Sequence, residues 1–311
     1  MPRIFMITAG LALQTFVTGA SPPSDHALAH KIRTLLHIVL TTEDEKKAAV
    51  ARNDVRQIFR KGGLPAIAEV GNGPAYDFVL LASLGQPIDF QSHVLPAITE
   101  AARLNAVPPD AAVFYQARYR LEKVKKSASE RAASNPGLRE EIERLYRVDQ
   151  AVRQQSGFNA KKMMATDKQN AAPLQSIFRK YGVPTYDMVG VQAAKDFVIM
   201  AQHQPPKFRQ EILPELRANV DAGQANPDSY ALVYDRSQRD QGKKQLYGTQ
   251  LECNAGETLH EAPIKDKAHV DQRRAELGLM RVDLYARLTA EMMPQFCPSL
   301  TPKKKAPRRT R

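Results

Sequence analysis

The residues that can carry chemistry gather in the second half of the chain. His203 follows the apolar segment 197–201 and precedes Pro205 and Pro206. Because histidine titrates nearest neutral pH, His203 is a candidate general acid or base, and Asp235 is a candidate to orient it. An alternative stays open, in which His203 is a cation at the C-terminal end of a helix and is stabilised by the helix dipole.

Polar residues around this pair predict a ligand site. Arg236 can hold a carboxylate or a phosphate through two parallel hydrogen bonds, although Arg118 at the matching place in the first half favours a structural clamp. Side chains alternate along the predicted strand 245–252, where Gly248 leaves a gap in which backbone or a ligand can approach closely. The predicted ligand-binding residues are Gln202, Arg236, Gln245, Tyr247, Thr249, Gln250 and Arg274.

The remaining polar motifs give no sign of a catalytic nucleophile, a metal site or a nucleotide site. Asp149 and Arg153 stand four apart on a predicted helix and are expected to form a structural ion pair. The sequence has no evident serine or cysteine nucleophile, metal-ligating spacing or nucleotide-binding fingerprint, so no metal or cofactor is predicted. We expect a module that binds a small polar or anionic ligand or a protein partner. The alternative is a hydrolase or transferase that uses His203 and Asp235 as an acid–base pair.

An internal repeat supplies the elements that would position these residues. Segment 58–65, IFRKGGLP, returns as IFRKYGVP at 177–184. After a gap of one residue the matches continue until Arg118 falls on Arg236. Since the register holds for about sixty residues, the sequence predicts a helical domain that has been duplicated.

The two predicted copies differ in their polar residues. Ser83, Leu84 and Ala117 of the first copy match Gln202, His203 and Asp235 of the second. If these polar residues were needed to fold the unit, the first copy should need them too. The comparison therefore places the site in the second copy, against the alternative that the polar residues only anchor an added hairpin.

The predicted fold class is mainly α, with a two-stranded β-hairpin added to the second copy. Apolar spacings of three and four predict helices, and Gly and Pro end them. The period-two segment 245–252, a turn at 254–256 and the returning segment 257–264 predict the hairpin. The expected helices include 26–40, 43–61, 75–84 and 90–105 in the first copy and 270–277 and 282–293 in the second.

Several motifs of the second copy resemble a family catalogued as domain of unknown function 6624. The resemblance covers roughly residues 138–290. Its pieces are Asp149-Gln150 with Arg153, 181–184 with 189–190, Gln202-His203, Asp235-Arg236, Gln245 with 247–250, and 270–279. Val183 stands where the family usually has Trp, a change that affects packing more than chemistry. The resemblance implies a domain and no activity.

The first residues of the chain predict a compartment, and the last residues predict a basic tail. Residues 1–20 have the charged, apolar and small-residue order of a signal peptide, so we expect an exported protein in the periplasm or outside the cell. No later segment is apolar and long enough to span a membrane. The net charge of +12 owes six charges to the stretch 301–311, and we expect a disordered basic tail at 299–311. Such a tail can contact an anionic surface, or simply keep the protein soluble.

The predicted domains and the cysteines complete the organisation. Between the signal peptide and the tail lie a degenerate first repeat at 21–135 and the second repeat at 138–295. Cys253 and Cys297 are the only cysteines. In an oxidising compartment an even pair is most simply a disulfide, so we expect these two to be bonded.

Overall fold

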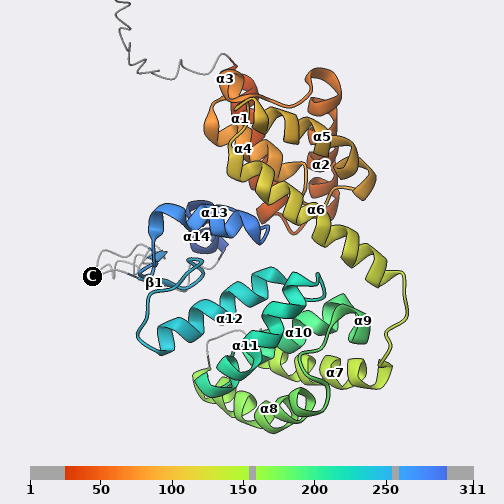
Figure 1. Ribbon diagram of the computed structural model, residues 1–311, viewed down its shortest axis with the longest axis vertical. Coiled ribbons are helices and arrows are strands. Elements are labelled where there is room, and N and C mark those ends of the chain that lie inside the picture. Colours follow the sequence, from red (N-terminus) through yellow and green to blue (C-terminus); the bar gives the residue numbers. More distant parts are fainter. Residues whose placement is uncertain (1–24, 154–158, 254–258, 293–311) are drawn as a thin grey trace, which may run out of the picture.

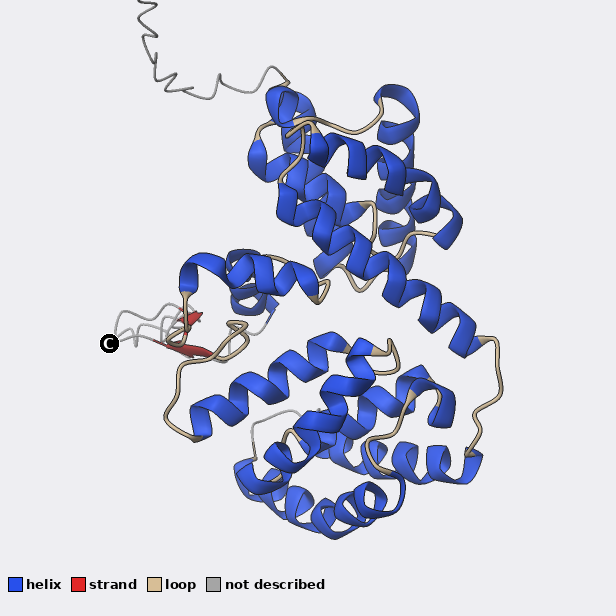
Figure 2. Ribbon diagram, viewed as in Figure 1, coloured by secondary structure: helices blue, strands red, loops and turns tan. Residues whose placement is uncertain are grey.

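The structure, a computed structural model, describes residues 25–153, 159–253 and 259–292. It is mainly helical with one small antiparallel sheet, and this part of the predicted fold class is confirmed (Figures 1 and 2). The predicted signal peptide, the basic tail and Cys297 lie outside the described residues. None of the described helices is both long and apolar enough to cross a membrane.

Six helices form the N-terminal lobe, at the top of Figure 1. They are α1 (His26–Thr41), α2 (Glu45–Gly62), α3 (Ile67–Val70), α4 (Asn72–Leu81), α5 (Ile88–Arg103) and α6 (Pro109–Ser129). Asp25 and Asp44 cap α1 and α2 by accepting bonds from backbone N–H groups of the first turn. α4 is almost wholly buried and forms the centre of this lobe's core, with Phe78 and Leu80 fully enclosed.

Six further helices form the C-terminal lobe, at the bottom of Figure 1. They are α7 (Pro136–Arg153), α8 (Ala160–Tyr181), α9 (Tyr186–Val189), α10 (Val191–Ala201), α11 (Pro206–Asp221) and α12 (Pro227–Asp240). The apolar helix α10 packs against α7 and α12, and its Phe197 and Met200 are fully buried. The C-terminal end of α10 is therefore enclosed by neighbouring helices.

The sheet is shorter than the predicted hairpin. β1 (Leu251–Cys253) pairs with β2 (Leu259–Glu261) in antiparallel register, with Glu252 opposite His260. Residues 246–250 form a loop and not a strand, and Gln245 makes an isolated bridge to Ile264. The prediction of a regular strand over 245–252 was wrong because Gly248, with φ of 73°, turns the backbone away from an extended path.

The last two helices return to the N-terminal lobe. α13 (Val270–Glu276) packs against α6, and α14 (Val282–Met292) contacts α1. Ala275 and Leu284 are buried in the core of the N-terminal lobe. At the same junction the guanidinium of Arg281 donates two bonds of 2.7 Å to Asp110 and lies 4.0 Å from the centre of the Tyr76 ring.

Candidate functional site

The predicted site residues lie in two separate groups on different sides of α12. Asp235 and Arg236 are consecutive on this helix, so their side chains point about 100° apart. Asp235 faces the loop 246–250, whereas Arg236 faces the C-terminal end of α10. The structure therefore does not bring Asp235 to His203 as the predicted orienting partner, because its carboxylate is bonded to the loop.

Asp235 is fully buried and holds the loop through its carboxylate. It accepts hydrogen bonds from the backbone N–H groups of Leu246 (2.8 Å), Tyr247 (3.0 Å) and Thr249 (2.9 Å). The Thr249 hydroxyl donates a further bond of 2.9 Å. Burial raises the pKa of Asp235, and the bonds it accepts act in the opposite direction. This carboxylate serves as a clamp for the loop.

Two more predicted ligand-binding residues, Gln245 and Arg274, tie the same loop down. The fully buried Gln245 donates to the carbonyls of Gln250 (2.9 Å) and Ala262 (2.7 Å), and its own carbonyl accepts from the Gln250 N–H group. The guanidinium of Arg274 donates to the carbonyl of Tyr247 at 2.6 Å. The polar atoms of Gln245 and Arg274 are thus engaged in holding backbone.

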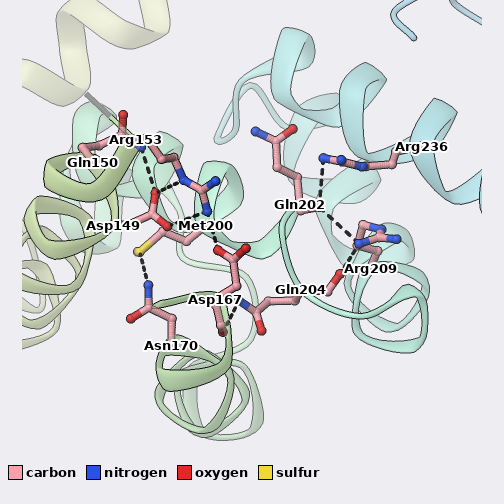
Figure 3. Close-up of polar contacts among 10 residues, drawn as sticks. All are labelled: Asp149, Gln150, Arg153, Asp167, Asn170, Met200, Gln202, Gln204, Arg209 and Arg236. Carbon is pink, nitrogen blue, oxygen red and sulfur yellow. Dashed lines mark hydrogen bonds and ion pairs between the residues drawn. The ribbon is translucent and has the colours of Figure 1, made fainter. Parts of the chain in front are cut away.

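The second group gathers at the C-terminal end of α10, where α7, α8 and α12 meet. We call it the polar cluster (Figure 3). Its members are Asp149, Gln150, Arg153, Asp167, Asn170, Gln202, His203, Gln204, Arg209, Arg236 and Asp240. Sequence analysis selected Gln202, His203 and Arg236 as site residues, and the structure keeps these three together.

Ion pairs occupy two of the three arginines in the polar cluster. Arg153 donates to both oxygens of Asp149, at 3.0 and 2.9 Å, and also to Asp167. The predicted pair of Asp149 with Arg153 is therefore confirmed. Arg209 is buried and pairs with Asp240 while also donating to the carbonyl of Gln204.

Arg236 is the arginine of the cluster that lacks a carboxylate partner among the described residues. Its guanidinium donates one long bond, 3.4 Å, to the carbonyl of Gln202. A guanidinium carries five N–H donors, so most of those on Arg236 are unused by the described protein atoms. Burial, followed by the nearby charge of Arg209, lowers the pKa of Arg236. Figure 3 shows Arg153 and Arg236 reaching toward the same region from opposite sides.

His203 lies within the electrostatic reach of all three arginines. Burial lowers its pKa to about 4, and the charges of Arg153, Arg236 and Arg209 add to this effect while Asp149 opposes it. The imidazole is therefore neutral at pH 7 and can accept a proton. The alternative of a protonated His203 that stabilises the end of α10 does not fit this environment.

Several members of the cluster were not predicted from the sequence. Asp167 and Asn170 are three apart on α8 and lie on its inward side, with Asn170 buried. Polar residues that share the buried face of a helix with Leu174 and Ile177 are a signal that could have been noticed. Arg209 and Gln204 gave no such signal, because their burial depends on how α11 packs. The described residues contain no group of three or more His, Cys, Asp or Glu side chains arranged for a metal ion.

Comparison with known proteins assigns the second half of the chain to a family. No curated protein and no solved structure matches the chain. A family model described as "Family of unknown function (DUF6624)" matches residues 136–294, which include both the polar cluster and the loop clamped by Asp235. This match covers just over half of the chain, and the chain belongs to the DUF6624 family.

Proposed function

We propose that the polar cluster binds a small anionic ligand, with Arg236 as the principal contact. The observation that carries the proposal is the half-buried guanidinium with a single long bond to the protein. A carboxylate or phosphate oxygen would take up the unused donors in charge-assisted hydrogen bonds. Gln202 and the neutral imidazole of His203 lie beside it and can add uncharged contacts.

We also propose that the two lobes are copies of one helical unit. Several paired contacts support this. Phe59 meets Phe90 edge-on at 5.9 Å, and the matching residues Phe178 and Phe208 meet edge-on at 5.8 Å. A backbone bond from Ile67 to Ala106 has its counterpart between Tyr186 and Gln224. An experimental structure in which 58–118 and 177–236 differ in helix order or handedness would overturn the proposal.

Under this duplication, the first lobe lacks most of the polar cluster. In the register that pairs Ile58 with Ile177, Asp167 and Asn170 of α8 match Ala48 and Ala51 of α2. Both alanines are buried, so the same scaffold folds there without the polar side chains. This contrast supports a role for the cluster beyond holding the helices together.

Isothermal titration of the full chain with inorganic phosphate and with acetate tests anion binding. We expect saturable binding of one of them, and Arg236→Ala should weaken it at least tenfold, since a charge-assisted bond contributes about 1.5–3 kcal/mol. Arg239→Ala is the matched control, because Arg239 is an exposed arginine on the same helix that pairs with Glu252. The absence of saturable binding to both anions, or equal weakening in both variants, would contradict the proposal.

A second candidate function is hydrolysis or group transfer. It is favoured by the place of His203 beside Arg236, where the neutral imidazole can take a proton from a water or a substrate hydroxyl, with the lowered pKa making it a weaker base than a free imidazole. Arg236 would then stabilise negative charge that develops on the substrate. Asp235 has no part in this version, and Asp149 is the nearby carboxylate that bears on the charge of His203.

A screen of phosphate esters and carboxylate esters separates catalysis from binding. If the cluster is catalytic, the protein turns over one ester class, and His203→Gln lowers kcat by about 10²–10⁴ while KM changes little. If the cluster only binds, His203→Gln leaves anion affinity within a few-fold of the wild type and no ester is consumed.

We propose export on sequence grounds alone. N-terminal sequencing of the mature protein is expected to give Ser21 as the first residue, and an intact Met1 would contradict this.

We also propose a disulfide between Cys253 and Cys297. Thiol labelling of the denatured, unreduced protein should then find no reactive thiol. Binding of the purified protein to anionic vesicles that is lost without residues 299–311 would support surface contact through the tail.

A further inference from the structure

A cleft of about 810 Å³ lies between the two lobes, apart from the polar cluster. Its lining residues come from α6 and the end of α13 on one side and from the end of α11 and the start of α12 on the other. The volume falls within the range of about 300–1,000 Å³ that is usual for small-molecule sites. Neither the proposed anion site nor the loop clamp accounts for this cleft.

Apolar side chains and one aromatic ring form much of the lining. Leu121 and Val124 come from α6, Val220 from α11 and Leu277 from the end of α13. Tyr247 adds its ring, which packs edge-on against Tyr230 at 6.1 Å and against Tyr234 at 5.7 Å. Leu121, Tyr247 and Leu277 are themselves buried, with exposed fractions of 7%, 6% and 9%, so they form a narrow apolar floor, and the half-buried Val124 and Val220 add apolar surface beside it.

The Asp235 carboxylate that holds the loop 246–250 also holds the Tyr247 side of the cleft in place. Tyr247 sits in the loop whose backbone N–H groups are held by Asp235, and Arg274 holds its carbonyl from the other side. The ring is therefore set in place by fully or almost fully buried groups. The polar residues that sequence analysis assigned to ligand contact thus position an aromatic wall of the cleft.

The cleft carries more basic than acidic side chains. Arg120, Lys123, Arg217 and Arg273 line it together with Asp221 and Glu276. Arg217 pairs with Asp221 at 2.8 Å, and Arg273 is engaged by backbone carbonyls and Asp266. The exposed Arg120 and Lys123 on α6 supply the positive charge at the opening.

We propose that this cleft binds an organic anion with a flat apolar body, such as an aromatic carboxylate or sulfonate. The apolar body would lie against Tyr247 and Leu277, and the acidic group would face Arg120 and Lys123 on α6. Pro227 of α12 lines the cleft whereas Arg236 belongs to the polar cluster, and nine helical residues separate them by about 13 Å along the axis.

Calorimetric titration of the full chain with naphthalene-2-sulfonate tests the proposal. We expect saturable binding at one site. Arg120→Glu combined with Lys123→Glu should weaken binding at least tenfold, because the acidic group then faces two like charges. Ala222→Trp places a bulky ring in the cleft from an exposed helix end and should abolish binding.

Arg144→Glu combined with Arg147→Glu is the matched control. These residues have the same spacing, are exposed on α7 and lie away from the cleft, so affinity should stay within twofold of the wild type. Arg236→Ala should also leave this affinity unchanged, which separates the cleft from the small-anion site. No saturable binding, wild-type affinity in Ala222→Trp, or equal weakening in the two double variants would overturn the proposal.

Discussion

Asp235 and Arg236 are neighbours in the sequence whose side chains serve different parts of the molecule. The buried carboxylate of Asp235 accepts hydrogen bonds from three backbone N–H groups and one hydroxyl of the same loop, and these donors take the place of water. Arg236 keeps donors that the described protein atoms do not use. The difference follows from helix geometry, because consecutive side chains on α12 face different neighbours. A motif of two adjacent residues can therefore support two separate roles.

The pKa of His203 predicts a measurable pH dependence of stability. The folded pKa of about 4 lies below the ordinary histidine pKa of 6.5, so the unfolded chain binds the proton more readily between these values. Stability from the neutral imidazole is present above pH 6.5 and is lost as the pH falls toward 4. The loss between pH 7.5 and pH 5 should be roughly 2 kcal/mol.

Urea unfolding of the wild type and of His203→Gln at both pH values measures this loss. Glutamine does not titrate in this range, so the variant should lose about 2 kcal/mol less than the wild type over the same interval. Comparing differences removes the contributions of the other titrating groups. An equal loss in both proteins would show that His203 is not the group responsible.

Asp235→Asn should destabilise the fold strongly. The asparagine amide turns donors toward a loop whose N–H groups need acceptors, so we expect a cost of about 2–4 kcal/mol. Asp228→Asn on the same helix is the control, because Asp228 is half exposed and 3.6 Å from Arg118. Its cost should stay below about 1 kcal/mol. Denaturant unfolding curves of the two variants give both values, and similar costs would contradict the clamp.

The element that most affects the proposed cleft is the loop between α12 and the sheet, which carries Tyr247. The backbone of Gly248 is in the left-handed region and passes close to Val282 of α14 and to Ile264. A Cβ atom on residue 248 would lie 2.5 Å from the Val282 side chain and 3.0 Å from the Ile264 side chain. The loop is thus shaped by contact with α14 and by the Asp235 carboxylate together. The sequence predicts a close approach at Gly248, and only the structure shows that α14 makes it and that Asp235 holds the loop.

Gly248→Ala and Gly242→Ala separate steric contact from backbone strain. Both glycines have positive φ, 73° and 67°, but a Cβ atom at Gly242 meets nothing within 4 Å. Strain of about 1–2 kcal/mol is common to both variants. Gly248→Ala should cost roughly 1–3 kcal/mol more because of the contact with Val282. Thermal unfolding measures the difference, and equal effects would mean that the loop can move away from α14.

At the scale of the whole molecule, the C-terminal helices join the two lobes. The family match ends at residue 294 and so includes α13 and α14, yet Ala275 and Leu284 belong to the core of the N-terminal lobe. Arg281 strengthens this junction through its bonds to Asp110. The N-terminal lobe therefore covers apolar surface that the family region supplies.

Leu284→Ala tests this dependence. Removing a buried leucine side chain should cost about 2–4 kcal/mol, and amide exchange should increase in α4 of the N-terminal lobe. Leu104→Ala is the matched control, since Leu104 is 59% exposed and its loss should cost under about 0.5 kcal/mol. If exchange in α4 stays at the wild-type rate in Leu284→Ala, the two lobes are not coupled through α14.

The sequence by itself determined the helical class, because apolar residues at spacings of three and four need no tertiary information to be recognised. It also determined the pairing of Asp149 with Arg153, since residues four apart on a helix are neighbours. Only the tertiary structure decided that Asp235 serves the loop while His203 and Arg236 stay together. The faces of α10 and α12 are assigned by which helices pack against them, and Asp167 and Arg209 reach the cluster only through that packing. Contacts between elements distant in the chain carry no local periodicity, so no spacing in the sequence records them.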